Sequence, residues 1–255
     1  MYYVSRSARE ENGGQFFLKT EANTSQSAPQ NAGVPFEEIR NTAGSTLSED
    51  QVLAILCRPE LPGEIIALLG KNPNVIKNPK ALFALITHNR APRHASIPLL
   101  RQLFTFDLMR VALMPAMAPD IKRIAEDQIL NRRERLSAGE KISLARRASA
   151  RVAAALLRDA DARVISSALH NPHMVEASVV AALMRKDAVA VLFELVSNHS
   201  EWSQRREVQI ALLKSENTPM ERAKEFARHF SQRLIVEIIP ESRRHELGEA
   251  ARARE

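Results

Sequence analysis

One short motif recurs along most of this chain and constrains its fold more than any other feature. The tripeptide Ala-Leu followed by Leu, Ile or Met begins at Ala67, Ala84, Ala112, Ala155, Ala182 and Ala211, with spacings of 17, 28, 43, 27 and 29 residues. The last three copies lie in longer segments that align, namely Val152–Asp159, Val179–Lys186 and Val208–Ser215. Each segment resembles an apolar helix end followed by a basic residue, which suits the negative end of a helix dipole. Repetition at this period indicates stacked, similar units.

Asn and Pro mark the boundaries of the same units. They occur together at Asn72-Pro73, Asn78-Pro79, Asn89-Arg-Ala-Pro92, Asn171-Pro172 and Asn217-Thr-Pro219. Asn can end one helix, and Pro suits the first turn of the next because its missing N–H has no intrahelical partner there. Capping boxes at Thr46–Glu49, Ser137–Glu140 and Thr218–Glu221 mark further helix starts. Such short helices bury their apolar stripes only by stacking on neighbours.

Composition supports helices and removes most catalytic chemistry. Only 8 of the 255 residues are Gly, and the aromatic residues are one Trp, two Tyr and nine Phe, which disfavours β-sandwiches and Gly-looped nucleotide folds. The chain has no phosphate-binding Gly-rich loop and no Gly-x-Ser-x-Gly elbow. We therefore expect an all-α protein that is not an enzyme and has no cofactor. An enzyme with a pocket on a concave surface stays open, because catalytic residues in a repeat fold need not lie close in sequence.

Charge and composition divide the chain into three parts. The formal charge of +6 is distributed as −3 over residues 1–51 and +9 over the rest. Residues 1–47 are rich in polar and acidic side chains and are expected to be a flexible tail. We expect a single elongated array of helical repeats over 48–247 and a frayed C-terminus over 248–255. A secretory signal and a membrane span are not expected, since no apolar run is long enough, so we expect a cytoplasmic location.

A family resemblance rests on one stretch of these repeats. The segment Arg158–Pro172, followed by Val179–Asp187, alternates Asp, Val, Leu and Asn-Pro. It resembles the repeats of bacterial leucine-rich repeat variant and HEAT-like proteins, most clearly over residues 150–220. The resemblance implies a right-handed α-solenoid and, as function, surface recognition. HEAT-like repeats mostly scaffold proteins, and some bacterial branches bind DNA or remove damaged bases from it. The cysteine-bound iron–sulfur module associated with leucine-rich repeat variants is not expected here, because Cys57 is the single cysteine.

A basic segment is the main candidate binding site. Residues 122–163 hold 11 Lys and Arg against 6 Asp and Glu. Apolar residues at helical spacing run from Ile142 to Leu156, so Arg147 and Arg151 are expected to share one helix face, with Arg158 two turns further on. Together with Arg146 they form a candidate basic face that could contact phosphates. The segment has no aromatic residue for base stacking, and an ordinary solvated face is the alternative interpretation.

Four further residues have two interpretations each. Trp202, the only tryptophan, is expected either to fill the space between two repeats or to serve as an exposed interface anchor. His170 and His173 have a spacing that could suit one metal ion. With no third ligand identifiable, a loop or capping role is expected and no metal site. Cys57 is expected to be buried as a small hydrophobic residue rather than to act as a nucleophile.

These observations lead to two functional hypotheses of different kinds. The leading one is a non-enzymatic scaffold that binds another protein along one face of the array, because stacked repeats create an extended surface. The alternative is a nucleic-acid-binding or DNA-repair-type HEAT-like protein that uses the Arg-rich face at 122–163. Salt-sensitive retention on DNA that depends on these arginines distinguishes the two.

Overall fold

The chain is helical wherever its structure is described. The computed structural model describes residues 37, 39, 40, 47–245 and 247. These residues form 15 α-helices, three 3-10 turns and no strand, which confirms the all-α prediction for this part of the chain. The α-helices are α2 (Glu49–Leu56), α3 (Gly63–Leu69), α4 (Pro73–Lys77), α5 (Pro79–Thr87), α6 (Arg93–Leu100), α7 (Thr105–Leu113), α8 (Pro119–Arg132), α9 (Ala138–Arg147), α10 (Ala150–Leu156), α11 (Ala162–Leu169), α12 (Glu176–Leu183), α13 (Ala190–Asn198), α14 (Arg206–Leu213), α15 (Met220–Ala227) and α16 (Gln232–Ile238). The 3-10 turns are η1 (Arg133–Arg135), η2 (Trp202–Gln204) and η3 (Glu241–Arg243).

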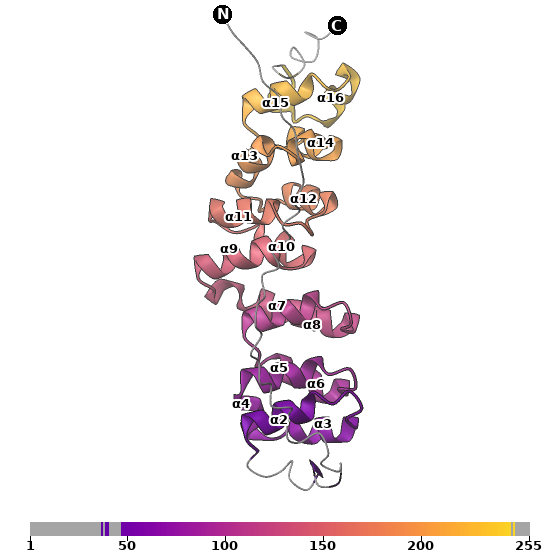
Figure 1. Cartoon of the computed structure of the whole chain (residues 1–255). Coiled ribbons are helices and arrows are strands. Elements are labelled where there is room, and N and C mark those ends of the chain that lie inside the picture. Colours follow the sequence, from indigo (N-terminus) through magenta and orange to yellow (C-terminus); the bar gives the residue numbers. More distant parts are fainter. Residues whose placement is uncertain (1–36, 38, 41–46, 246, 248–255) are drawn as a thin grey trace, which may run out of the picture.

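The helices stack in chain order along one long axis (Figure 1). In the middle of the stack, alternate helices pack on each other. Helix α8 contacts α10, α10 contacts α12 and α12 contacts α14, and we call these four helices the even row. Helices α9, α11 and α13 contact one another in the same way and form the odd row. The rows meet through the contacts of α10 with α9 and α11 and of α13 with α14, so this region is a double row of short helices.

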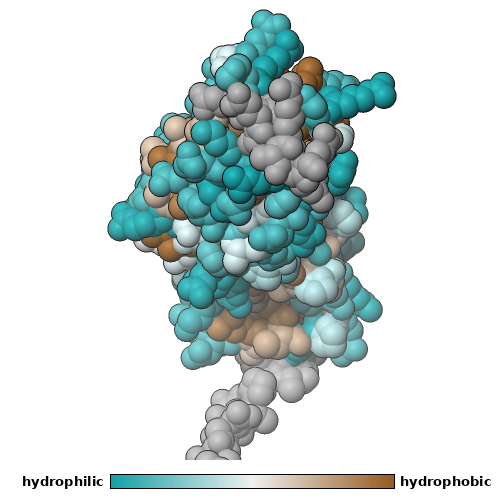
Figure 2. All heavy atoms as spheres, turned by 90° about the horizontal axis from the view of Figure 1, so that it is seen from above, coloured by the Kyte–Doolittle hydropathy of each residue, from teal (hydrophilic) through white to brown (hydrophobic). Residues whose placement is uncertain are grey.

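Each helix is stabilised by the apolar stripe that it buries between its neighbours. Helix α11 illustrates the pattern, because Val164, Ile165, Ala168 and Leu169 are buried at helical spacing. A helix of eight residues is marginal in isolation, so packing rather than intrinsic propensity maintains it. The buried side chains form one continuous cluster that runs from Ile39 to Leu247. The surface seen along the long axis is mostly hydrophilic, with separate apolar patches (Figure 2).

The helix starts agree only in part with the sequence signals. Ser137 and Glu140 form the expected capping box at α9, and Asn72 and Asn78 cap α4 and α5 ahead of a proline as expected. At α2 the box is instead made by Ser48 and Gln51.

The box predicted at Thr218 is wrong. The Thr218 hydroxyl donates a 2.6 Å hydrogen bond to the carbonyl oxygen of Leu212. It therefore closes the end of α14 instead of beginning α15, whose N-cap is Pro219 without a side-chain hydrogen bond.

The helix expected to continue from Ser137 to Leu156 is broken in the middle. Ala148 is extended, with φ −72° and ψ 175°, and Ser149 is the N-cap of α10. The break directs the chain from the odd row to the even row. It leaves carbonyl groups at the end of α9 without intrahelical partners, and the buried side chain of Asn171 donates to two of them, those of Ala145 (2.7 Å) and Ala148 (3.0 Å).

Similar hydrogen bonds link each unit to the preceding one. A side-chain donor reaches back 25–33 residues to a carbonyl at or just beyond the end of an earlier helix: Arg132 to Leu103, Asn171 to Ala145, Trp202 to Leu169 and Arg222 to Ser197. These carbonyls lack intrahelical partners. The separations of the bonded pairs, 25–33 residues, bracket the spacings of 27 and 29 residues between the last three copies of the repeated motif.

The predicted ends of the chain fall mostly outside the described residues. Within the predicted tail, Ile39 is helical and only 1% exposed, so the expectation of a flexible tail over 1–47 does not hold at this residue. The predicted frayed segment 248–255 lies wholly outside the described part. No described helix combines the length and the apolar character required to cross a bilayer.

Candidate functional site

The four arginines of the predicted basic face do not lie on one helix. Arg146 and Arg147 end α9 in the odd row, whereas Arg151 lies in the first turn of α10 and Arg158 follows its end in the even row. The expectation that Arg147 and Arg151 share a helix face is wrong, because the extended backbone at Ala148 separates them. All four side chains are exposed. Spacing alone suggested a continuous ridge, and the break in the helix divides it.

Arg151 and Arg158 instead line a hollow of about 600 Å³ on the exposed side of the even row. A third arginine, Arg185 from the end of α12, joins them and was not recognised in the sequence. The rest of the lining is made of small or apolar residues, Leu130, Ala150, Ala154, Ala155, Ser178, Ala181 and Ala182. We call this site the even-row hollow. It extends over α8, α10 and α12, three helices that are consecutive in space but not in sequence.

The lining of the even-row hollow comes from equivalent positions of two repeats. Residues 154, 155 and 158 of one unit correspond to residues 181, 182 and 185 of the next, with a constant offset of 27. An offset of 29 then carries Arg185 onto Lys214 at the C-cap of α14. The alignment of Val152–Asp159 with Val179–Lys186 was therefore the signal that could have identified Arg185.

The charged groups around the hollow differ in how far they are neutralised. Arg151 donates to Asp127 at 2.6 Å and to Glu126 at 3.3 Å. The hydrogen bond to Asp127 is the main reason that the pKa of Arg151 is raised. Arg185 pairs with Asp187 at 2.8 Å, and this bond lowers the pKa of the Asp187 carboxyl. Within the described part of the chain, Arg158 and Lys214 form no ion pair or hydrogen bond through their side chains.

Trp202 is not the exposed anchor that one hypothesis required. Its side chain is only 4% exposed, and the indole Nε1 donates a 2.8 Å hydrogen bond to the carbonyl oxygen of Leu169. The guanidinium of Arg205 covers the ring at 5.5 Å from its centroid. Trp202 therefore has the other expected role, because it fills the space between the end of α11 and the start of α14.

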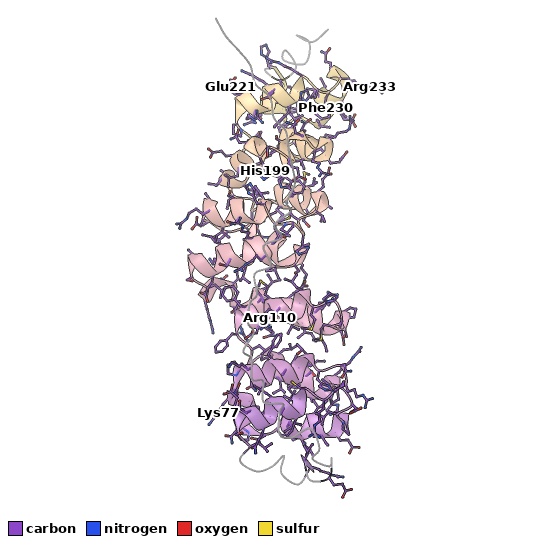
Figure 3. The ribbon with its side chains drawn as sticks, viewed as in Figure 1. Lys77, Arg110, His199, Glu221, Phe230 and Arg233 are labelled. Atoms are coloured by element: carbon purple, nitrogen blue, oxygen red, sulfur yellow. The ribbon has the colours of Figure 1, made fainter. Side chains whose placement is uncertain are left out.

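The expected pair of histidines is replaced by another. The ring of His170 lies against His199, with centroids 4.7 Å apart. His199 caps the end of α13 (Figure 3), and its Nδ1 accepts a hydrogen bond from the backbone N–H of Glu201 at 3.1 Å. Burial, and secondly the neighbouring His170, lower the pKa of His199.

The two imidazoles border a second hollow of about 450 Å³, which Trp202, Glu176 and Arg205 also line. Among the described residues, no group of three or more His, Cys, Asp or Glu side chains is arranged to hold a metal ion. The described lining therefore does not provide the set of ligands that a metal centre requires.

The expected burial of Cys57 is wrong. Its side chain is exposed at the C-cap of α2, directly after the last apolar turn of that helix. The apolar run that precedes Cys57 made burial the natural expectation, but the helix ends one residue earlier and turns the thiol toward solvent. Cys57 lines none of the hollows described above.

The even-row hollow is equipped for recognition of anions. Guanidinium groups form strong charge-assisted hydrogen bonds with carboxylates and phosphates. The described lining contains no carboxylate, imidazole or thiol, and Ser178 is its one hydroxyl.

Comparison with known proteins finds no family model, no curated protein and no solved structure that matches this chain.

Proposed function

We propose that this chain is a non-enzymatic scaffold of HEAT-like helical repeats, a right-handed α-solenoid that acts in the cytoplasm and binds another protein along one face. The double row of short helices supports the repeat architecture, because in the middle of the stack, from α8 to α14, each helix packs on the second helix along the chain. The side-chain hydrogen bonds that each join residues 25–33 positions apart support it independently.

The even-row hollow is the observation that carries the proposal. It extends over three helices, so a ligand that fills it contacts several repeats at once. Its floor is mostly alanine, and small side chains allow the backbone of a ligand to come close to the helices. Stacked repeats characteristically bind partners along extended surfaces of this kind.

Nucleic-acid binding through the 122–163 face has less support. The arginines of that segment are divided between the two rows, and Arg151 is already paired with Glu126 and Asp127. Phosphate contacts depend on cations whose charge is available to the ligand. For these reasons we favour a protein partner over a polynucleotide.

The test fills the hollow with a large side chain. Ala181 is exposed on its floor, so Ala181→Trp blocks the hollow without entering the core. Ala190→Trp is the matched control, since Ala190 is an exposed alanine at the start of α13 in the odd row. Full-length bait proteins are recovered from nuclease-treated extracts of the source cell, and their partners are quantified by mass spectrometry.

We expect the wild type and Ala190→Trp to recover the same partner proteins, and Ala181→Trp to recover about tenfold less. Equal recovery by all three baits, with unchanged melting temperatures, contradicts the proposal. Recovery that is seen in a parallel extract without nuclease, and that is absent from the nuclease-treated one, favours the nucleic-acid alternative instead.

A further inference from the structure

We propose that the segment of the partner that occupies the even row is extended and acidic, and that its carboxylates lie against Arg158, Arg185 and Lys214. We call these three residues the basic ladder. This inference rests on the proposed function and specifies the chemistry of the ligand. It is carried by the repeat positions of the three cations, by the small side chains between them and by the acidic groups beside them.

The three cations of the ladder occupy equivalent positions on neighbouring helices. Each follows, or caps, the end of its helix: Arg158 after α10, Arg185 after α12 and Lys214 at the end of α14. Helix α10 packs on α12 and α12 on α14, and packed helices lie about 8–10 Å apart. The ladder therefore presents a positive charge about every 8–10 Å along the even row.

An extended polypeptide can match this spacing. In a polyproline II conformation, three residues make one turn and advance the chain by about 9 Å. Side chains three residues apart then point the same way. A segment with Asp or Glu at every third position places one carboxylate opposite each of the three cations, which we call the rungs of the basic ladder.

The surface between the rungs suits the backbone of such a segment. Ala154 and Ala181 occupy equivalent positions on α10 and α12 and lie on the floor of the even-row hollow. Because neither has a side chain beyond Cβ, an extended backbone can lie close to both helices. The short side chain of Asp or Glu then reaches the guanidinium groups at the helix ends.

The charged residues around the even row favour a ligand with separate carboxylates over a continuous polyanion. Arg158 and Lys214 form no ion pair or hydrogen bond through their side chains within the described chain. The pKa of the Asp187 carboxyl is lowered first by its hydrogen bond with Arg185 and also by the charge of Arg158, so a ligand at Arg158 shares that charge with Asp187. Asp127 and Asp187 lie beside the arginines of the hollow, and Glu207 is exposed on α14 at the position equivalent to Ser178. These carboxylates repel a chain that is charged at every unit. The described lining also has no aromatic ring on which a base could stack.

The test compares two synthetic peptides of equal composition and charge. The spaced peptide has the sequence Glu-Ala-Pro-Glu-Ala-Pro-Glu, in which proline favours the extended conformation. The clustered peptide, Ala-Pro-Glu-Glu-Glu-Ala-Pro, has its three carboxylates in a row. Both carry fluorescein, and their binding to the full-length protein is measured by fluorescence anisotropy at low and physiological salt. A 12-nucleotide oligothymidylate serves as the polyanion probe.

We expect the spaced peptide to bind about tenfold more tightly than the clustered one, because only the spaced peptide places carboxylates at both Arg158 and Lys214, the two cations of the ladder that have no ion pair among the described residues. The double variant Arg158→Ala/Lys214→Ala removes the two unpaired rungs and is expected to weaken the spaced peptide about tenfold. Arg146→Ala/Arg147→Ala is the matched control, since it removes two exposed arginines from the odd row. It is expected to change the affinity less than twofold.

Three outcomes overturn the inference: equal binding of the two peptides, an equal loss in the odd-row control, or tighter binding of the oligonucleotide that depends on the ladder. The partner-recovery experiment distinguishes failure of this inference from failure of the proposed function. If the ladder variant recovers the cellular partners as well as the wild type while Ala181→Trp does not, the scaffold proposal stands and the acidic ligand is wrong. If Ala181→Trp also recovers them fully, the proposed function itself fails.

Discussion

The indole of Trp202 donates its hydrogen bond to the carbonyl oxygen of Leu169, the last residue of a helix in the preceding unit, at 2.8 Å. The ring is buried, so this bond satisfies a helix-end carbonyl that water does not reach. Asn171 and Arg222 make equivalent bonds elsewhere in the stack. The units are therefore linked by side-chain donors at helix ends as well as by their apolar faces.

Replacement of Trp202 separates these two contributions. Trp202→Phe keeps an aromatic ring but leaves the Leu169 carbonyl without its donor, which is expected to cost about 1–3 kcal/mol of unfolding free energy. Trp202→Ala also removes the packed ring and is expected to cost about 3–5 kcal/mol. Urea denaturation followed by circular dichroism measures both values. If the two variants are equally stable, the ring contributes nothing, and the account of Trp202 is wrong.

Loss of the Asn171 side chain is expected to lower the stability of the folded protein, because this side chain bonds the backbone where α9 ends and α10 begins. Asn171→Ala leaves two buried carbonyl groups, those of Ala145 and Ala148, without a donor. A buried polar group without a partner costs about 1–3 kcal/mol. Thermal unfolding checks this, with Pro172→Ala at the exposed neighbouring position as control. If Asn171→Ala has the same melting temperature as Pro172→Ala, the proposed role of Asn171 is wrong.

Stability is expected to fall as the pH is lowered below about 6.5, the ordinary pKa of histidine. The pKa of folded His199 is lower than this value, chiefly because of burial and secondly because of His170, while Glu201 acts in the opposite direction. The unfolded chain therefore binds a proton more readily than the folded chain between the two pKa values. This contribution is fully present above the unfolded pKa and is lost as the pH falls to the folded one.

Unfolding free energies measured from pH 7.5 to 5 check the expectation for His199. His199→Gln removes the titrating group and should flatten the pH dependence over this range. His173→Gln is the control, since His173 is exposed and lies outside the His170–His199 pair. An unchanged pH profile in His199→Gln contradicts the assignment.

The thiol of Cys57 is expected to react in the folded protein. Because Cys57 is exposed and is the single cysteine, a chromogenic disulfide reagent should modify one equivalent without denaturant. The rate should be similar in urea. A thiol that reacts only after unfolding contradicts the exposed position at the end of α2.

Local signals in the sequence predicted local structure well. Ser137 with Glu140, and Asn72 and Asn78 before proline, mark true helix starts because each signal acts within one turn of backbone. The capping box predicted at Thr218 was wrong because the buried Thr218 hydroxyl donates its hydrogen bond to the carbonyl oxygen of Leu212. The break at Ala148 left no local signal, since its compensation comes from Asn171, 23 residues away.

The candidate site was predictable only in part, because it too depends on contacts between residues that are distant in sequence. Arg151 and Arg158 were identified from charge density, but the grouping with Arg185 depends on the packing of α10 against α12. The burial of Trp202 depends likewise on α11, which ends 33 residues before it in sequence. Contacts between repeats decide both outcomes, and a single segment does not show them.

Photo-crosslinking in the source cell identifies the molecule that occupies the even-row hollow. A benzophenone amino acid is placed at position 181 in the even-row hollow, and at position 190 in the odd row as control. Crosslinked products are then separated and identified as protein or nucleic acid. The proposed scaffold predicts a defined protein adduct at position 181 that is absent at position 190. Adducts of nucleic acid at position 181, or equal protein adducts at both positions, would contradict it.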